Sequence, residues 1–342
     1  MEEPPCWTLY FFIALHLPAV RTLVFYGIGL AIVFGLEKVD LSISWWACIP
    51  WALLLWSALV FASLAPFTHP RIRTVSILLY VLITGVLCAA FVIQTPSEQV
   101  YILDSGIGGW GMDSAERVIL PFLAHQGIHH IEGLILSHAH ADHIGGAKTI
   151  LQHIPVDTVY VGRGFESAPS NMAQEIHKMT EYPRQPLRIL AAGEIFWLGT
   201  CCPSMVLAPF NCSEGAQITQ SSNLNNQSLV FKTFIGHHSI LWTGDAEKES
   251  EQTQLSWAIP ILPSSILKTG HHGSRTSTSP SYLEQVRPSI AMTSVGLRNR
   301  YRLPNQEVAR RLDSINTTHL TTSLHGTVHL QTDGQKIRIL LN

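Results

Sequence analysis

Long apolar stretches dominate the first third of the chain. No Asp, Glu, Lys or Arg occurs from Leu41 to Pro70, and none from Thr74 to Ser97. Segments 45–65 and 75–93 are each long enough to cross about 30 Å of hydrocarbon as a helix, and the shorter segment 20–36 is a third candidate. Buried helices of a soluble protein are the weaker alternative, because such uncharged stretches are hard to place there. We therefore expect a membrane region over residues 1–96 with about three transmembrane helices.

Three arginines predict how this region is oriented in the membrane. Arg71 and Arg73 lie between the second and third predicted spans, and Arg21 lies at the start of the first. Short loops rich in Lys and Arg stay in the cytoplasm. The third span then runs outward, so we expect the C-terminal domain on the outer or periplasmic side of the inner (cytoplasmic) membrane.

After the apolar region, short β-rich runs alternate with helical runs. Apolar alternation and turn residues predict strands at 100–104, 133–137, 156–161, 229–234, 239–243 and 290–295. Capping residues and helical periodicity predict helices at 113–127, 144–153, 280–286 and 306–312. Interleaved strands and helices indicate a layered α/β domain over residues 97–342.

Composition narrows the protein class. Only 13% of the 342 residues are charged and 46% are hydrophobic, which excludes a wholly soluble enzyme, a disordered chain and a small disulfide scaffold. The net charge of −2 gives no general attraction to nucleic acid. An oxidising compartment would permit a bridge from Cys201 or Cys202 to Cys212, although a structural role for all these cysteines is the simpler interpretation.

The most informative segment is Ser137–Gly146, with the sequence Ser-His-Ala-His-Ala-Asp-His-Ile-Gly-Gly. His138 and His140 are two residues apart, so an extended backbone points them the same way. Asp142 and His143 follow where the chain turns into a helix. Nitrogen and oxygen donors without a thiolate suit zinc or manganese, and two adjacent clusters suit two metal ions.

The His-x-His-x-Asp-His pattern after a strand resembles the metallo-β-lactamase family, and further motifs follow in that family's order. Asp104 resembles its acid at an early strand end, Thr243-Gly-Asp245 its bridging acid, and Gly270-His-His-Gly273 its late histidine motif. The resemblance implies an αββα sandwich with a two-metal site. Its implied metal ligands are His138, His140, Asp142, His143, Asp245 and His271, with His271 favoured over His272.

A narrower resemblance is to the outer domain of ComEC-type DNA-internalisation (competence) proteins. Residues 116–146, 226–230 and 267–312 carry it, including Leu-Lys-Thr-Gly-His-His-Gly-Ser-Arg-Thr-Ser. It implies uptake of transforming DNA as one strand, with this domain as the suspected nuclease for the other. It also implies DNA, the membrane and other DNA-uptake proteins as partners.

The chain departs from this family in three ways. It has about half the family's usual length, and the opening strands with their Asp-Val-Gly-Gln-Gly-Asp motif are absent, so the N-terminal hairpin of the domain is expected to be missing. No histidine stands where the first metal needs a third ligand, and Asn226 or Ser228 occupies that segment. Asp104 and His272 are, like Asn226 and Ser228, candidates for alternative or supporting metal ligands.

Arginines supply a local attraction for phosphate. Six of them lie between residues 287 and 311, against Glu307 alone, and their forked donors suit phosphate oxygens. A solvated surface is the equally simple alternative. Tyr301 would stack a base or pack in the core. The predicted nucleic-acid contacts are Arg275, Arg298, Arg300 and Arg302.

The sequence thus predicts a membrane-anchored, metal-dependent phosphodiesterase of the DNA-uptake type. Two divalent ions, Zn or Mn, are its expected cofactors, with Asp142, His143 and Asp245 as catalytic residues. Two alternatives remain open. One is a small ester or thioester hydrolase on the same fold. The other is a truncated or non-catalytic subunit that works with a separately encoded channel half.

Overall fold

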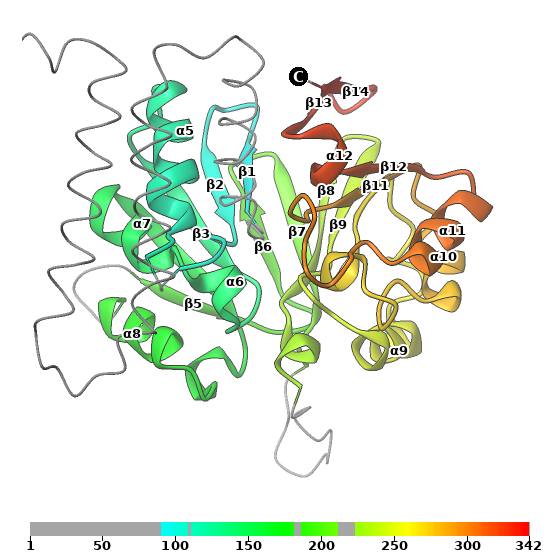
Figure 1. The fold of residues 1–342 in the computed structure, drawn as a ribbon, viewed down its shortest axis with the longest axis horizontal. Helices are drawn as coiled ribbons and strands as arrows, with labels where there is room; N and C mark the ends of the chain where they lie inside the picture. Colours follow the sequence, from blue (N-terminus) through cyan, green and yellow to red (C-terminus); the bar gives the residue numbers. More distant parts are fainter. Residues whose placement is uncertain (1–89, 109–110, 181–185, 211–222, 342) are drawn as a thin grey trace, which may run out of the picture. The chain divides into compact units, whose positions relative to one another are not determined.

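The computed structural model describes residues 90–108, 111–180, 186–210 and 223–341, which form a layered α/β domain (Figure 1). The three predicted spans lie outside these residues, apart from positions 90–93 at the end of the third. Among the described residues, no helix combines the length and the hydropathy needed to cross a bilayer.

Two β-sheets form the centre of the domain. The first has the strand order β1-β2-β3-β4-β5, and the second has the order β12-β11-β10-β9-β8-β7-β6. The first consists of β1 (Phe91–Gln94), β2 (Val100–Leu103), β3 (Ile131–Leu136), β4 (Val156–Gly162) and β5 (Leu187–Leu190). The second consists of β6 (Ile195–Leu198), β7 (Cys202–Ala208), β8 (Val230–Ile235), β9 (His238–Trp242), β10 (Ile266–Lys268), β11 (Ile290–Thr293) and β12 (Thr318–Thr321). β13 (Val328–Thr332) and β14 (Ile337–Leu341) form a separate antiparallel hairpin.

Helices cover the outer face of each sheet (Figure 1). Beside the first sheet lie a π-helical turn (Ala115–Ile119), α5 (Leu120–His125), α6 (Ala141–Ile144), α7 (Ala147–His153) and α8 (Asn171–Met179). Beside the second lie α9 (Lys248–Trp257), α10 (Pro280–Val286) and α11 (Gln306–Ser314), and α12 (Thr322–His325) follows β12. Short 3₁₀ turns occur at Phe165–Ser167, Leu224–Gln227 and Gly270–Gly273. The order helix, sheet, sheet, helix is the predicted αββα sandwich.

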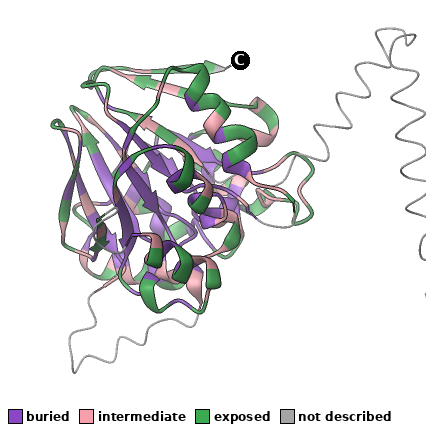
Figure 2. Ribbon diagram, turned by 90° about the vertical axis from the view of Figure 1, so that its left-hand side faces the viewer, coloured by how far each residue is buried: buried purple, intermediate pink, exposed green. Residues whose placement is uncertain are grey.

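The core consists of three apolar layers, because the strands bury side chains on both faces. In β2, Val100 and Ile102 pack toward the helices, whereas Tyr101 and Leu103 pack toward the second sheet. This alternation follows from the two-residue period of a strand. A third layer joins the second sheet to α10 and α11. Buried positions are accordingly concentrated in the strands in Figure 2.

The beginning of the domain differs from the prediction. Residues 91–93 were assigned to the third membrane span, and the domain was expected to begin at 97. Phe91–Gln94 instead forms β1, which pairs antiparallel with β2 and brings Phe91 opposite Leu103. A short apolar run fits the end of a helix and a buried strand equally well, so hydropathy did not distinguish them. β1 and β2 thus form an antiparallel hairpin, although the Asp-Val-Gly-Gln-Gly-Asp motif of the family's opening strands is absent from the sequence.

The strand directions bring the candidate site residues to one edge of the sandwich. β2 and β3 run parallel in the first sheet, and β9 and β10 run parallel in the second. The carboxyl ends of parallel strands lie at the same edge of their sheet. Asp104 follows β2, His138 follows β3, and Asp245 and His272 follow β9 and β10. Residues far apart along the chain are thus brought to one edge of the sandwich.

Candidate metal centre

Two glycines shape the turn that carries Asp142 and His143. A Cβ atom on Gly145 would lie 1.9 Å from the backbone nitrogen of Gly108, and one on Gly146 would lie 2.6 Å from the Ser105 carbonyl oxygen. The loop after β2 therefore passes directly against this turn, and only glycine fits. The predicted helix 144–153 is accordingly divided, since α6 ends at Ile144 and α7 begins at Ala147.

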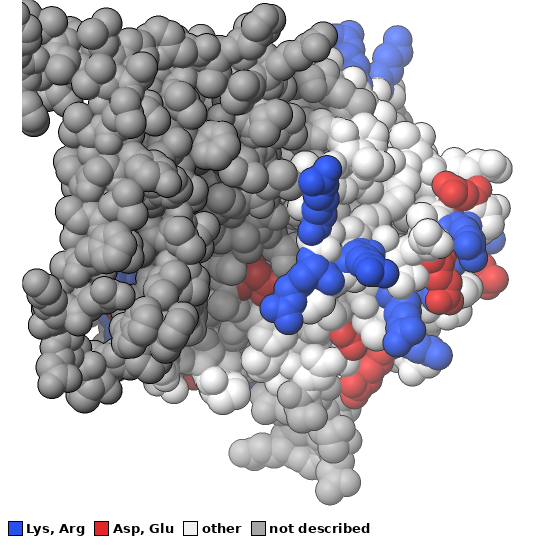
Figure 3. Space-filling view, viewed as in Figure 1, with Lys and Arg blue, Asp and Glu red and all other residues white. Residues whose placement is uncertain are grey.

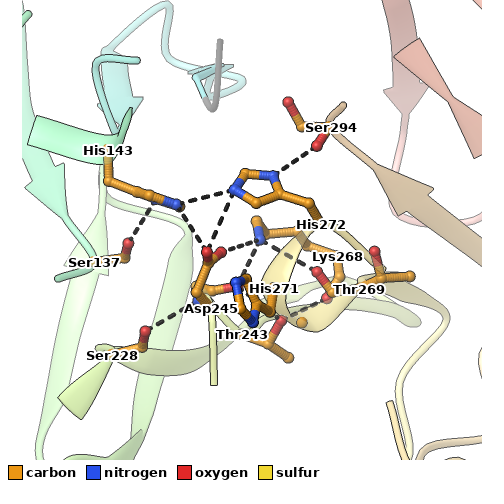
Figure 4. Close-up of polar contacts among 12 residues, drawn as sticks. Ser137, His143, Ser228, Thr243, Asp245, Lys268, Thr269, His271, His272 and Ser294 are labelled. Carbon is orange, nitrogen blue, oxygen red and sulfur yellow. Dashed lines mark hydrogen bonds and ion pairs between the residues drawn. The ribbon is translucent and has the colours of Figure 1, made fainter. Parts of the chain in front are cut away.

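Four side chains converge beyond the strand ends. One ligand atom each from Asp142, His143, Asp245 and His272 lies within 4.8 Å of all the others. The Nε2 atoms of His143 and His272 are 3.3 Å apart, and they lie 3.1 and 3.3 Å from Asp245 Oδ2. Figure 4 shows the two rings directed toward each other above the Asp245 carboxylate. This set of nitrogen and oxygen donors fits a divalent metal ion such as zinc or manganese.

Hydrogen bonds at the far nitrogen orient each imidazole. His143 Nδ1 lies 2.7 Å from Asp104 Oδ2, and His272 Nδ1 lies 2.8 Å from the Ser294 carbonyl oxygen. With Nδ1 donating to these acceptors, Nε2 of each ring faces the cluster. Such outer partners fix the tautomer and the orientation of metal-binding histidines. Asp104 is fully buried and also accepts hydrogen bonds from the backbone N–H and hydroxyl of Ser137, so it supports the cluster from behind.

Charges within the cluster shift the pKa values of its two histidines and of Asp245. Burial lowers the pKa of His143, but the carboxylates of Asp245 and Asp104 outweigh burial and raise that pKa to about 10. Burial likewise lowers the pKa of His272, and Asp245 and Asp142 raise it to about 9. Burial raises the pKa of Asp245, yet the two histidines hold it well below its usual range. Without a cation, protonated imidazoles therefore neutralise the carboxylates.

A pH dependence of metal binding follows. Because the pKa values of His143 and His272 are raised to about 10 and 9, both rings are protonated at neutral pH, and a metal requires them neutral. We expect metal binding at pH 7 to release about two protons, and the apparent affinity to rise by up to about 100-fold per pH unit below pH 9. Calorimetric titration in two buffers of different protonation enthalpy measures the release. A buffer-independent heat would contradict this prediction.

His138 and His140 lie beside the cluster. His138 Nε2 is 3.0 Å from His140 Nδ1, and the ring centroids of His138 and His143 are 4.2 Å apart. Burial, followed by the charge of His143, lowers the pKa of His138 well below its usual value, so this ring is neutral and able to act as a ligand. The structure thus brings the first histidine pair next to the four converging side chains.

The favoured residue of the His-His pair differs from the prediction. His272 is buried in the cluster, whereas the side chain of His271 is 30% exposed and its Nδ1 lies 2.8 Å from Glu247 Oε1. Both residues have positive φ angles, 42° and 52°. Because the backbone turns sharply there, adjacent side chains point to different places. Spacing alone did not reveal which ring reaches Asp245.

Asn226 and Ser228 do not join the cluster. Asn226 Oδ1 accepts the backbone N–H of Glu247 at 3.0 Å, and its Nδ2 donates to Glu249 at 2.9 Å. Ser228 Oγ accepts the backbone N–H of Asp245 at 3.0 Å. Both side chains therefore hold the segment around Asp245 in position. Their prediction as alternative ligands is not supported by this geometry.

Lys268 lies beside the cluster, and the sequence analysis did not predict it as a site residue. Its side chain is 1% exposed, and its Nζ donates to the Gly244 carbonyl at 2.6 Å and lies 3.6 Å from Asp245 Oδ1. The buried ammonium adds positive charge behind the Asp245 carboxylate and ties the two strand ends together. Its position directly before Thr-Gly-His-His was the available signal, because a lysine inside an apolar strand needs a buried partner.

The predicted DNA contacts lie on the surface. Arg275, Arg298, Arg300 and Arg302 are exposed. Arg311, which was counted among the same arginines, instead donates to the carbonyls of Ser277 and Thr278 at 3.1 Å. Among the cysteines, Cys201 and Cys202 are free thiols, and Cys212 lies outside the described residues.

Comparison with known proteins relates part of this chain to known families. A family model of the metallo-β-lactamase superfamily matches residues 83–194. The diiron β-hydroxylase CmlA from Streptomyces venezuelae shares the fold, with a TM-score of 0.50 and 13% identity over 75% of this chain and 53% of that protein. ComE operon protein 3 of Bacillus subtilis is 32% identical over 213 residues, which is 62% of this chain. The chain is a partial homologue of the ComEC-type competence proteins.

The homology covers only part of these competence proteins. Competence protein ComA of Neisseria gonorrhoeae is 28% identical over 213 residues, which is 62% of this chain and 27% of the relative. The corresponding share of ComE operon protein 3 is 26%. This chain therefore spans about a quarter of the length of these ComEC-type relatives. The family model covers Asp142 and His143 of the cluster, whereas Asp245 and His272 lie beyond its last residue.

Proposed function

We propose that this chain is a membrane-anchored, metal-dependent phosphodiesterase that hydrolyses DNA during uptake of transforming DNA. The observation that carries the proposal is the convergence of Asp142, His143, Asp245 and His272 within 4.8 Å in a domain homologous to competence proteins. The predicted spans would anchor the chain in the inner membrane with this domain on the outer side.

The donors define what the site would hold. Asp142, His143, Asp245 and His272 would bind one divalent cation, and His138 and His140 would bind a second beside Asp245. Zn²⁺ or Mn²⁺ suits these nitrogen and oxygen ligands. A cation held there lowers the pKa of water and offsets negative charge that develops on a phosphate. Asp104 meanwhile retains the proton on His143 Nδ1, 2.7 Å away, and so keeps Nε2 of that ring directed at the cation.

Charge around the cluster supports a nucleic-acid substrate. Figure 3 shows Lys and Arg side chains on the half of the domain that carries β11, α10 and α11, with Asp and Glu side chains among them. Arg275 lies three residues after His272, and Arg298, Arg300 and Arg302 lie in the segment after β11. Arginine binds phosphate oxygens through two donors at once. The chain would therefore act on DNA, and its homology to competence proteins favours other DNA-uptake proteins as partners.

Hydrolysis of linear DNA by the full-length chain tests the proposal. We expect cleavage with Mn²⁺ or Zn²⁺, none after chelation, and loss of cleavage in His140→Ala. His153→Ala is the matched control, because His153 is an exposed helical histidine whose Nδ1 lies 2.8 Å from the Thr149 carbonyl oxygen, outside the cluster. It is expected to cleave DNA like the unmodified chain.

Two outcomes would contradict the proposal. Turnover of a thioester without DNA cleavage would indicate a small-molecule hydrolase on the same fold. No activity in a folded, metal-loaded chain would indicate a non-catalytic subunit of a split channel.

A further inference from the structure

The segment between β11 and α11 is attached at both ends to the turn that carries His272. At its start, the Ser294 carbonyl oxygen accepts the Nδ1 hydrogen of His272 at 2.8 Å. At its end, the backbone N–H of Asn305 donates to the Gly273 carbonyl at 2.9 Å. A Cβ atom on Gly273 would come within 2.7 Å of the Pro304 side chain. The intervening residues 296–304, called the arginine loop below, therefore lie next to the metal centre.

One side chain organises the arginine loop from within. Asn299 Nδ2 donates to the carbonyls of Gly296 and Leu303 at 3.1 and 2.7 Å, and Asn299 Oδ1 accepts the backbone N–H of Leu303 at 2.8 Å. Three hydrogen bonds thus close the loop across its base. A loop ordered in this way loses less conformational entropy when it binds a ligand.

Two arginines in this loop adopt an unfavourable backbone conformation. Arg298 and Arg302 have φ angles of 53° and 54°. Glycine would adopt these angles without steric cost, whereas a residue with a Cβ pays about 1 kcal/mol. The loop nonetheless carries long cationic side chains at both places. Such strain points to a use for the side chains themselves.

The surface of the arginine loop combines charge with an aromatic ring. Arg298, Arg300 and Arg302 are exposed, and Tyr301 and Leu297 are 60% and 40% exposed. The Arg300 guanidinium carbon lies 5.0 Å from the centre of the Tyr301 ring, close enough for a cation–π contact. The sequence has no Asp or Glu between Glu284 and Glu307. The loop is therefore a positively charged surface with an accessible ring.

We propose that the arginine loop binds a single strand of nucleic acid, with a base stacked on Tyr301 and phosphates bound by Arg298, Arg300 and Arg302. Duplex binding would need only the arginines, since paired bases keep their faces stacked on one another. An unpaired base offers its face to an aromatic ring, whatever its identity. This inference rests on the proposed function, because it specifies that the nucleic acid reaching the cluster is single-stranded. It makes Tyr301 the residue that selects unpaired substrate.

Binding to a labelled oligothymidylate and to an abasic oligomer of the same length tests this proposal. The full-length chain is used in detergent, with a chelator present so that nothing is hydrolysed. We expect Tyr301→Ala to weaken oligothymidylate binding about 5- to 150-fold, the usual loss for one stacked base, and to leave abasic binding unchanged. Tyr301→Phe is the matched control, because the ring and not the hydroxyl is required, and it is expected to bind both probes normally.

The contribution of the arginines is tested separately, through the dependence of binding on salt concentration. Arg300→Gln is expected to weaken binding of both probes and to reduce the slope of log affinity against log salt by about 0.7, the value for one phosphate contact on a single strand. Unchanged oligothymidylate affinity in Tyr301→Ala would overturn the proposal, because the ring would then make no contact with a base. An equal loss for both probes would also overturn it. Because hydrolysis with Mn²⁺ is measured independently, binding without cleavage would contradict the phosphodiesterase and not the arginine loop.

Discussion

Replacing His272 with alanine is expected to remove bound metal and to reduce DNA hydrolysis at least about a thousandfold, because several kcal/mol of charge stabilisation depend on the cation. His272 is buried, and its Nε2 lies 3.3 Å from Asp245 Oδ2. Elemental analysis of the purified full-length chain and a hydrolysis assay measure the two effects.

The neighbouring histidine supplies the matched control. His271→Ala removes the same side chain one residue earlier, from a ring that contacts Glu247 and not Asp245. We expect this variant to retain its metal. Thermal unfolding of both variants checks that each is folded. Loss of metal from His271→Ala, with retention in His272→Ala, would restore the assignment made from the sequence.

Asp104→Asn is expected to weaken metal affinity about 10- to 100-fold, the usual effect of losing the hydrogen-bonding partner of a metal-binding histidine. Asp104 Oδ2 lies 2.7 Å from His143 Nδ1, and both side chains are fully buried. The neutral amide no longer favours the orientation and basicity that His143 needs. Competition with a chromophoric chelator measures the apparent dissociation constant.

A second histidine–aspartate pair offers the control for this variant. His130 Nε2 lies 2.8 Å from Asp157 Oδ1 at an exposed position away from the cluster. Asp157→Asn makes the same chemical change there, and we expect it to leave metal affinity unchanged. Equal effects of the two substitutions would mean that Asp104 does not act through His143.

Much of the fold could be predicted because it depends on local patterns. Strands β2, β3, β4, β8, β9 and β11 fall within or close to their predicted ranges. The helix predicted at 306–312 is α11, and Asn305 caps it with its Oδ1 2.9 Å from the backbone nitrogen of Glu307. The helix predicted at 280–286 is α10; Ser279 directly precedes it, and Glu251 accepts the backbone N–H of Ser279 at 3.0 Å. The sequence therefore predicted where these helices begin, but it did not predict the contact with the distant residue Glu251.

The sequence by itself determined four neighbouring residues of the candidate metal site. His138, His140, Asp142 and His143 are neighbours along the chain, so a strand followed by a turn must bring them together. Asp245 could be recognised because Thr243-Gly-Asp245 follows a predicted strand and resembles the bridging acid of the metallo-β-lactamase family. The first assignment needs only short-range geometry, and the second also needs the family resemblance.

Only the tertiary structure decided the partners that depend on packing between distant elements. The left-handed turn at residues 271 and 272 directs His272, and not His271, to Asp245. Pairing with β2 makes Phe91–Gln94 a strand, and the end of the buried strand β10 brings Lys268 to Gly244. Each outcome depends on which side chain faces the other sheet or loop, and a periodic pattern contains no information about that contact.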